Sequence, residues 1–158
     1  MRYRCQIHVF EPVKEFHNQL SERFQGYPQI TCHPFGLGGR TEAATISRAG
    51  DRSSHVQSGG GDLTETIELM GFTDFVREHN ISRINLLKLN IEGAEYELLE
   101  KILMVGWAEN ITDLQVQFHN VGPDSPHRRQ ALRHRLRLTH ELTYDFYFVW
   151  ENWRLKHS

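Results

Sequence analysis

The sequence predicts an α/β fold built around a mostly parallel sheet. Three apolar runs have the length of strands, and apolar residues recur at helical spacing after them; the runs are Ile7–Phe10, 84–91 and 114–118. Each run ends in polar residues. Strands that alternate with helices favour a parallel sheet, because the crossover between parallel strands usually contains a helix.

The first predicted strand, Ile7–Phe10, ends in Glu11 and is followed by an amphipathic helix over residues 13–24. The core face of this helix carries three apolar residues spaced four apart: Phe16, Leu20 and Phe24. Residues 30–35 form a candidate strand, and the Gly-rich residues 36–39 form a turn after it.

The middle of the chain is the least regular part. Residues 40–62 are rich in Gly, Ser and charge, which is typical of a loop and would suit a lid. Residues 64–69 have the composition of a short strand, and 72–79 that of a helix. The inward face of this helix is marked by three apolar residues: Phe72, Phe75 and Val76.

The central run, 84–91, stops abruptly at Glu92 and Gly93, and a helix-spaced pattern begins near Glu95. Two interpretations of the two acids are open. Both stand at a helix entrance, where the helix dipole favours negative charge. Both also follow a buried strand, and the carboxyl ends of such strands line the crevice where open α/β sheets bind ligands.

The third strand, 114–118, ends in an imidazole. If the three strands run parallel, their polar ends converge on one edge of one sheet, and the converging side chains are Glu11, Asn90, Glu92, Gln117 and His119. We therefore expect a site at that edge.

The predicted helix 126–138 is preceded by Ser125, a suitable N-cap, with Pro126 at the first helical position. It carries five arginines: Arg128, Arg129, Arg133, Arg135 and Arg137. Because the helix has no aromatic residue for stacking and the chain is not basic, we expect a solvated face and no nucleic-acid partner. A substrate with phosphate or carboxylate could still use one or two of these arginines. The aromatic tail, 142–155, predicts a closing antiparallel pair at the sheet edge.

The bulk composition fits a single domain over residues 1–158 with 39% hydrophobic content. The formal charge of −2 gives no general attraction to nucleic acid or to an anionic membrane.

The two cysteines, Cys5 and Cys32, are expected to be buried and reduced. Because no apolar stretch is long enough to span a membrane and no signal-peptide core follows the polar start, we expect a cytoplasmic protein. The ten histidines show no metal-binding spacing, so no metal site is expected.

Three motifs together carry a family resemblance. They are Val9-Phe10-Glu11-Pro12, the stretch Leu86-Leu87-Lys88-Leu89-Asn90-Ile91-Glu92-Gly93-Ala94-Glu95, and Val116-Gln117-Phe118-His119. In this order they resemble the FkbM family of S-adenosylmethionine-dependent O-methyltransferases, from Ile7 to about Trp153. The resemblance implies a class I methyltransferase fold, which is Rossmann-like with helices on both faces of the sheet. It also implies methyl transfer from S-adenosylmethionine to a hydroxyl group. The acceptor would be a sugar-containing or similar small molecule, or a glycan.

The resemblance also implies roles for individual residues. Glu11 would accept hydrogen bonds from the cofactor's ribose hydroxyls, and Phe35 would contact its adenine. Asn90 would orient the cofactor or the acceptor through its amide. His119 is the expected general base, although a histidine bonded to a backbone carbonyl would look the same in the sequence. Glu92 and Glu95 would cap the helix, hold the acceptor or bind an ion, and Gln117 would contact the acceptor. Asn90 and Glu92 are also counted among the catalytic residues.

The sequence departs from the family pattern at three places. The family commonly has Asp where Asn90 stands and often Glu where Gln117 stands. Its first strand and Gly-rich turn are missing before Ile7, so an N-terminally truncated sheet is expected. A second copy could cover the strand edge left exposed, which would make the protein a homo-oligomer.

Two other functions stay open. A methyltransferase-like remnant or binding module without catalysis would explain the missing turn, although the retained polar residues at all three strand ends argue against it. Nucleic-acid binding through the arginine helix is the weaker alternative.

Overall fold

The computed structural model describes residues 5–47 and 64–156. The chain divides into two compact units: Met1–Leu37 with Thr41–Met70, and Gly38–Arg40 with Gly71–Ser158. The expectation of a single domain stays a prediction. Of the expected lid, residues 48–62 lie outside the described residues.

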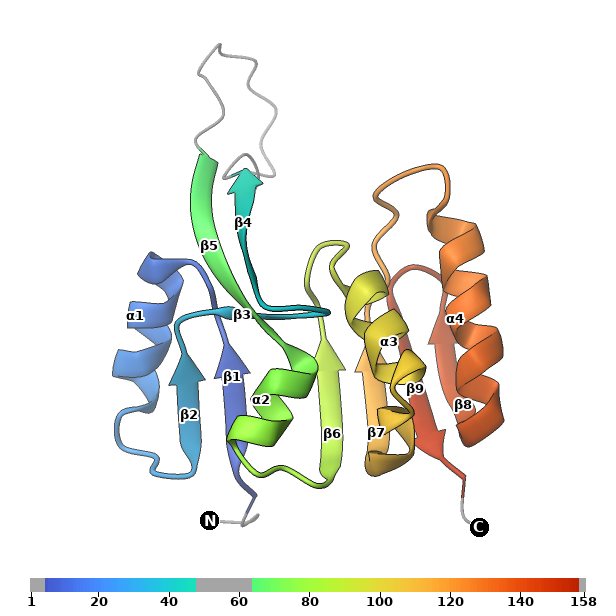
Figure 1. Ribbon diagram of the computed structural model, residues 1–158, viewed down its shortest axis with the longest axis horizontal. Helices are drawn as coiled ribbons and strands as arrows, with labels where there is room; N and C mark the ends of the chain where they lie inside the picture. Colours follow the sequence, from blue (N-terminus) through green and yellow to red (C-terminus); the bar gives the residue numbers. More distant parts are fainter. Residues whose placement is uncertain (1–4, 48–63, 157–158) are drawn as a thin grey trace. The chain divides into compact units, whose positions relative to one another are not determined.

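The first unit contains a parallel strand pair. Strands β1 (Ile7–Phe10) and β2 (Ile30–His33) are joined by helix α1 (Lys14–Phe24) and pair in the register Val9↔Cys32 (Figure 1). The Glu11 N–H donates to the His33 carbonyl at 3.1 Å, which places Glu11 at the carboxyl end of this pair. The strand, helix and second strand predicted over this segment are therefore confirmed, although β2 ends two residues earlier than expected.

A second sheet has the order β3-β5-β4, formed by β3 (Gly36–Gly38), β4 (Glu42–Ser47) and β5 (Thr64–Gly71). Strands β4 and β5 are antiparallel, with Glu42 opposite Leu69. The prediction of a loop was wrong for β4, because this six-residue run pairs along its whole length with β5.

The second unit is built on a four-stranded sheet. Its order is β6-β7-β9-β8, with β6 (Ile84–Leu89), β7 (Ile111–Val116), β8 (His140–Phe146) and β9 (Trp150–Leu155). Strands β6 and β7 are parallel, whereas β7–β9 and β8–β9 are antiparallel. The sheets are therefore mixed rather than mostly parallel, because the predicted aromatic tail folds back as a hairpin. That hairpin itself is confirmed, with β8 at the edge.

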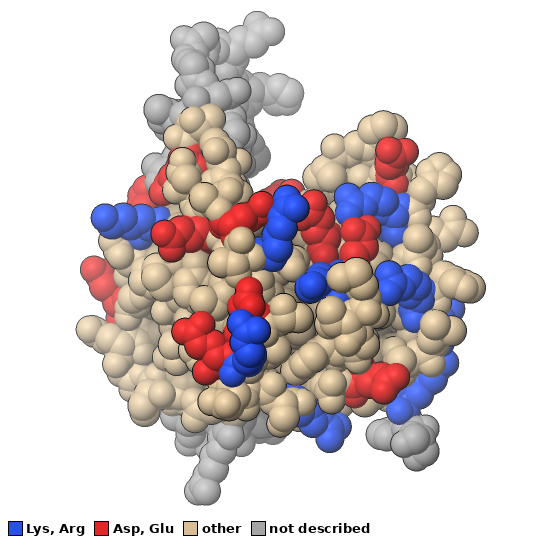
Figure 2. All heavy atoms as spheres, in the orientation of Figure 1, with Lys and Arg blue, Asp and Glu red and all other residues tan. Residues whose placement is uncertain are grey.

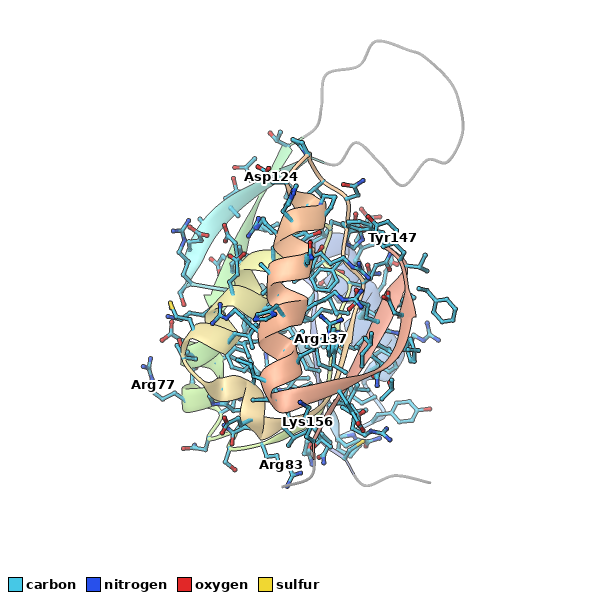
Figure 3. The ribbon with its side chains drawn as sticks, turned by 90° about the vertical axis from the view of Figure 1, so that its right-hand side faces the viewer. Arg77, Arg83, Asp124, Arg137, Tyr147 and Lys156 are labelled. Carbon is cyan, nitrogen blue, oxygen red and sulfur yellow. The ribbon has the colours of Figure 1, made fainter. Side chains whose placement is uncertain are left out.

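Three helices and a 3-10 turn pack in this unit: α2 (Phe72–Glu78), α3 (Glu95–Met104), η1 (Trp107–Asn110) and α4 (Ser125–Thr139). Leu87 and Leu89 of β6 are buried while the intervening Lys88 is exposed, so one face of the sheet forms the core. Helices α3 and α4 lie over the same face (Figures 1 and 3). Within the described residues of this unit, α3 and α4 thus cover one face. The prediction of helices on both faces concerned the whole sheet and stays a prediction.

The two cysteines were not placed correctly. Both are free thiols, but Cys5 is exposed and Cys32 is half-buried. Cys5 precedes β1 instead of lying in it, and Cys32 is on a two-stranded sheet that offers little cover.

Candidate active site

The loop after β6 makes a sharp turn that its glycine requires. Glu92 has φ +50° and Gly93 has φ +104°, both in the left-handed region. A Cβ on Gly93 would lie 2.9 Å from Cγ1 of Val121, so a larger residue would collide with the loop that follows β7. The turn therefore brings the two loops together.

Glu95 fixes this arrangement from inside. It is the first residue of α3, its exposed fraction is 0%, and it accepts hydrogen bonds at both carboxylate oxygens. Oε2 accepts the N–H of Gly93 at 2.8 Å, and Oε1 accepts the backbone N–H of His119 at 2.7 Å. A buried carboxylate needs such donors, and here they come from both loops of the site.

His119 lies between two carboxylates. Its Nδ1 is 3.2 Å from Oε1 of Glu95, and its Nε2 is 3.5 Å from Oε1 of Glu92. The exposed fraction is 16% for the His119 side chain and 85% for that of Glu92. Because a carboxylate only accepts, Glu95 favours the proton on Nδ1, and a neutral ring then has its free electron pair on Nε2 at the accessible side.

Tyr96 holds the backbone of the same loop. Its hydroxyl donates to the carbonyl of His119 at 2.8 Å, and burial raises the pKa of Tyr96 above its ordinary value of 10.0, which keeps the donor protonated. Ser125 adds a second tie, since its Oγ accepts the N–H of Gly122 at 3.1 Å. Neither role was predicted from the sequence. Ser125 was expected at the N-cap, but Asp124 occupies that position.

Asn90 and Gln117 lie beside each other at the same edge. Leu89 pairs with Val116, and the Gln117 N–H then donates to the Leu89 carbonyl at 3.0 Å, so the pairing continues as far as these two residues. Asn90 is exposed and Gln117 is half-buried. The structure thus gathers Asn90, Glu92, Glu95, Gln117 and His119 in the second unit.

The other two predicted residues, Glu11 and Phe35, lie in the first unit. The Oε1 atom of Glu11 accepts the N–H of Val13 at 2.9 Å.

Phe35 lines a cavity of about 270 Å³ with Thr41, Glu42, Ala43, Glu68, Leu69 and Met70. A Cβ on Gly36 would lie 2.7 Å from Cδ2 of Leu69 and 3.5 Å from Cγ of Pro12, so the chain next to Glu11 packs close to the cavity wall. Convergence of these two residues with the second group stays a prediction.

The prediction of a solvated arginine face holds for only part of α4, since Arg135 and Arg137 are exposed but the other arginines form ion pairs. Arg129 is 6% exposed and forms ion pairs with Glu151 and, at 2.7 Å, with Asp145. Arg133 pairs with the same acids at 3.3 and 2.6 Å, and Arg128 pairs with Glu100 at 3.0 Å. Figure 2 accordingly shows basic and acidic side chains next to each other on this side of the second unit. Asp145 lies on β8, Glu151 on β9 and Glu100 on α3, and none of these contacts with α4 could be predicted from the local sequence pattern.

Two further features concern ligands and membranes. Within residues 5–47 and 64–156, no three His, Cys, Asp or Glu side chains are grouped as metal ligands. None of the described helices is long and apolar enough to span a membrane.

Comparison with known proteins identifies the family. The model of the methyltransferase FkbM domain matches residues 1–146, a range that includes the first unit and most of the second. No curated protein and no solved structure matches the chain. Since the match extends over most of the sequence, the chain belongs to the FkbM methyltransferase family.

Proposed function

We propose that the protein transfers a methyl group from S-adenosylmethionine to a hydroxyl of a sugar-containing or similar small acceptor, with His119 as the general base. One observation carries the proposal. The buried Glu95 carboxylate lies 3.2 Å from Nδ1 of His119, which leaves Nε2 as the proton-accepting nitrogen beside the exposed Glu92. A base oriented by a second group in this way is the common arrangement for removing a hydroxyl proton.

The chain's own residues would act as follows. Nε2 of His119 takes the proton of the acceptor hydroxyl, and the nearby Glu92 carboxylate favours the imidazolium that forms. Asn90 and Gln117 supply amide groups at the same edge to orient the acceptor. Glu95 has no exposed surface, so in place of the predicted acceptor contact we propose a positioning role for it.

The residues of the first unit suit the cofactor's adenosine. Glu11 keeps lone pairs for ribose hydroxyls, because Val13 uses only one of its oxygens. The cavity beside Phe35 combines apolar walls with the acids Glu42 and Glu68, which suits a flat base that carries an amino group. When bound, the cofactor supplies a methyl group activated on a sulfonium.

The parallel pairs β1–β2 and β6–β7 support a Rossmann-like sheet of the class I methyltransferase type.

Transfer is tested by incubating the 158-residue protein with labelled S-adenosylmethionine and a panel of neutral glycosides, and detecting the methylated product by mass spectrometry. His119→Ala should lower kcat by about 10²–10⁴-fold, the usual contribution of a positioned general base. His127→Ala, at an exposed position of α4, is the matched control and should leave kcat unchanged.

Cofactor binding is measured separately by calorimetry. Glu11→Ala should weaken it by about 1.5–3 kcal/mol, the range for hydrogen bonds to a charged group, whereas His119→Ala should not. Near-normal kcat in His119→Ala would refute its role as the base. Acceptor binding without transfer would favour a non-catalytic binding module.

A further inference from the structure

The tip of the β8–β9 hairpin is an exposed aromatic turn, formed by Tyr147, Phe148 and Val149. Tyr147 has an exposed fraction of 66%, and Phe148 adopts φ +51°, a conformation that bulky residues rarely take. The N–H of Val149 donates to the carbonyl of Phe146 at 2.8 Å and closes the turn. Nothing in the mechanism above uses this hairpin tip.

The hairpin tip lies at the same end of the sheet as the proposed base. Val116, the last residue of β7, pairs with Glu151 near the start of β9. The hairpin tip before β9 and the His119 loop after β7 therefore lie at the same end of the strands. Figure 3 shows Tyr147 at the same end of this unit as Asp124, where α4 begins.

One guanidinium connects the hairpin tip with the His119 loop. The Cζ atom of Arg129 lies 4.8 Å from the ring centroid of Tyr147, 5.5 Å from that of Phe148 and 6.0 Å from that of Phe118. Phe118 immediately precedes His119. Cation–π contacts at these distances hold the two aromatic rings of the tip in place relative to the base.

The charge of Arg129 is paired inside the protein, although its buried Nε has no hydrogen-bond partner within the described residues. Asp145 accepts from Arg129 at 2.7 Å and from Arg133 at 2.6 Å, and both arginines also pair with the buried Glu151. The hairpin tip therefore offers aromatic surface without a charge that awaits a partner. A cationic ligand is disfavoured as well, because a guanidinium already occupies one side of the Tyr147 ring.

We infer that the hairpin tip is the acceptor subsite, and that it selects a neutral, hydroxyl-bearing ring. The free side of Tyr147 packs on the apolar face of that ring while one ring hydroxyl reaches Nε2 of His119. Aromatic side chains suit this contact, since they bury a large area with few rotatable bonds. The inference deepens the proposed function and rests on it for the identity of the base.

Binding is tested with three matched probes: methyl glucoside, which is neutral, the corresponding methyl glucosaminide, which is cationic, and methyl glucuronide, which is anionic. Saturation-transfer NMR on the full chain measures the affinity of each without any need for turnover. The neutral glycoside should bind most tightly. Tyr147→Ala should weaken its binding by about tenfold, the scale of a ring-stacking contact with its buried area, and Tyr147→Phe should preserve it.

Phe146→Ala is the matched control. Its exposed fraction of 63% is close to that of Tyr147, but Phe146 lies on the opposite face of the sheet from Asp145, so its removal should leave binding unchanged. Thermal melts establish that each variant is folded. Equal losses in Tyr147→Ala and Phe146→Ala, or tighter binding of either charged glycoside, would overturn the inference.

The two proposals fail in different ways. Tyr147-dependent binding of the neutral glycoside without methyl transfer would support the subsite and refute the proposed function. Transfer with an unchanged KM in Tyr147→Ala would support the function and refute the subsite.

Discussion

Replacement of Glu95 by Gln tests whether one buried carboxylate holds the site together. The native side chain accepts hydrogen bonds from Gly93 N–H at 2.8 Å and from His119 N–H at 2.7 Å, one at each oxygen. Glutamine has the same shape but only one oxygen. If that oxygen stays with His119, the amide group points a donor at the N–H of Gly93, and the two donors repel.

The size of the effect follows from these contacts. A hydrogen bond to a charged acceptor contributes about 1.5–3 kcal/mol, and the bond that remains in the variant is weaker because its acceptor is neutral. We therefore expect Glu95→Gln to lower the free energy of unfolding by about 2–3 kcal/mol. Hydrogen exchange should show faster opening at the amides of Gly93 and His119, which the two lost or weakened bonds protect.

Glu97 provides the control. It is exposed in the same first turn of α3 and experiences the same helix dipole, so Glu97→Gln should cost less than about 1 kcal/mol. Urea denaturation followed by circular dichroism gives both values. Equal changes in the two variants, with no change in exchange at His119, would show that Glu95 acts only as a helix-entrance charge.

Two further predictions concern pH and backbone strain. Burial lowers the pKa of His140 below its ordinary 6.5, and the hydrogen bond to the Ile111 carbonyl opposes this shift in part. As the pH falls below 6.5, His140 therefore binds a proton in the unfolded chain but not in the folded chain. The free energy of unfolding should thus decrease on acidification, and His140→Gln should reduce this slope in thermal melts between about pH 7.5 and 5.5. Glu92→Gly relieves a left-handed conformation that costs a non-glycine residue about 1 kcal/mol, so the variant should unfold at an equal or higher urea concentration while methyl transfer falls. Parallel loss of stability and transfer would instead assign Glu92 a structural role.

The sequence was sufficient for the parts of the fold that depend on local pattern. The apolar run of β6, the glycine after it and the helical spacing of α3 together predict a strand, a turn and a helix, and the structure has all three. Boundaries shifted by one to three residues: β7 begins at Ile111 and ends at Val116, because pairing with β6 sets its limits and hydrophobicity does not.

The arginine helix shows what local pattern cannot provide. Helical spacing places Arg129 on the face of α4 that carries the buried Leu132 and Leu136, and it places the exposed Arg135 off that face. Nothing within α4, however, shows that a charge can be buried there. The partners that allow it are Asp145 and Glu151, which lie on strands whose place in the sheet depends on a hairpin and on β9 pairing with β7. Long-range pairing therefore decides which charges are structural, and the same pairing brings the hairpin tip to the edge that holds His119.

The two acids of the central motif have different environments because only one of them belongs to the helix. Both were expected at the helix entrance, but α3 starts at Glu95, and Glu92 remains in the left-handed turn before it. One carboxylate is consequently buried with its oxygens on backbone N–H groups, and the other is 85% exposed beside Nε2 of His119. In the proposed mechanism these two like residues, three positions apart, serve separate purposes: Glu95 orients the imidazole, and Glu92 lies on the side from which the acceptor would arrive. A single turn conformation, fixed by the close packing of Gly93 against Val121, is what separates them.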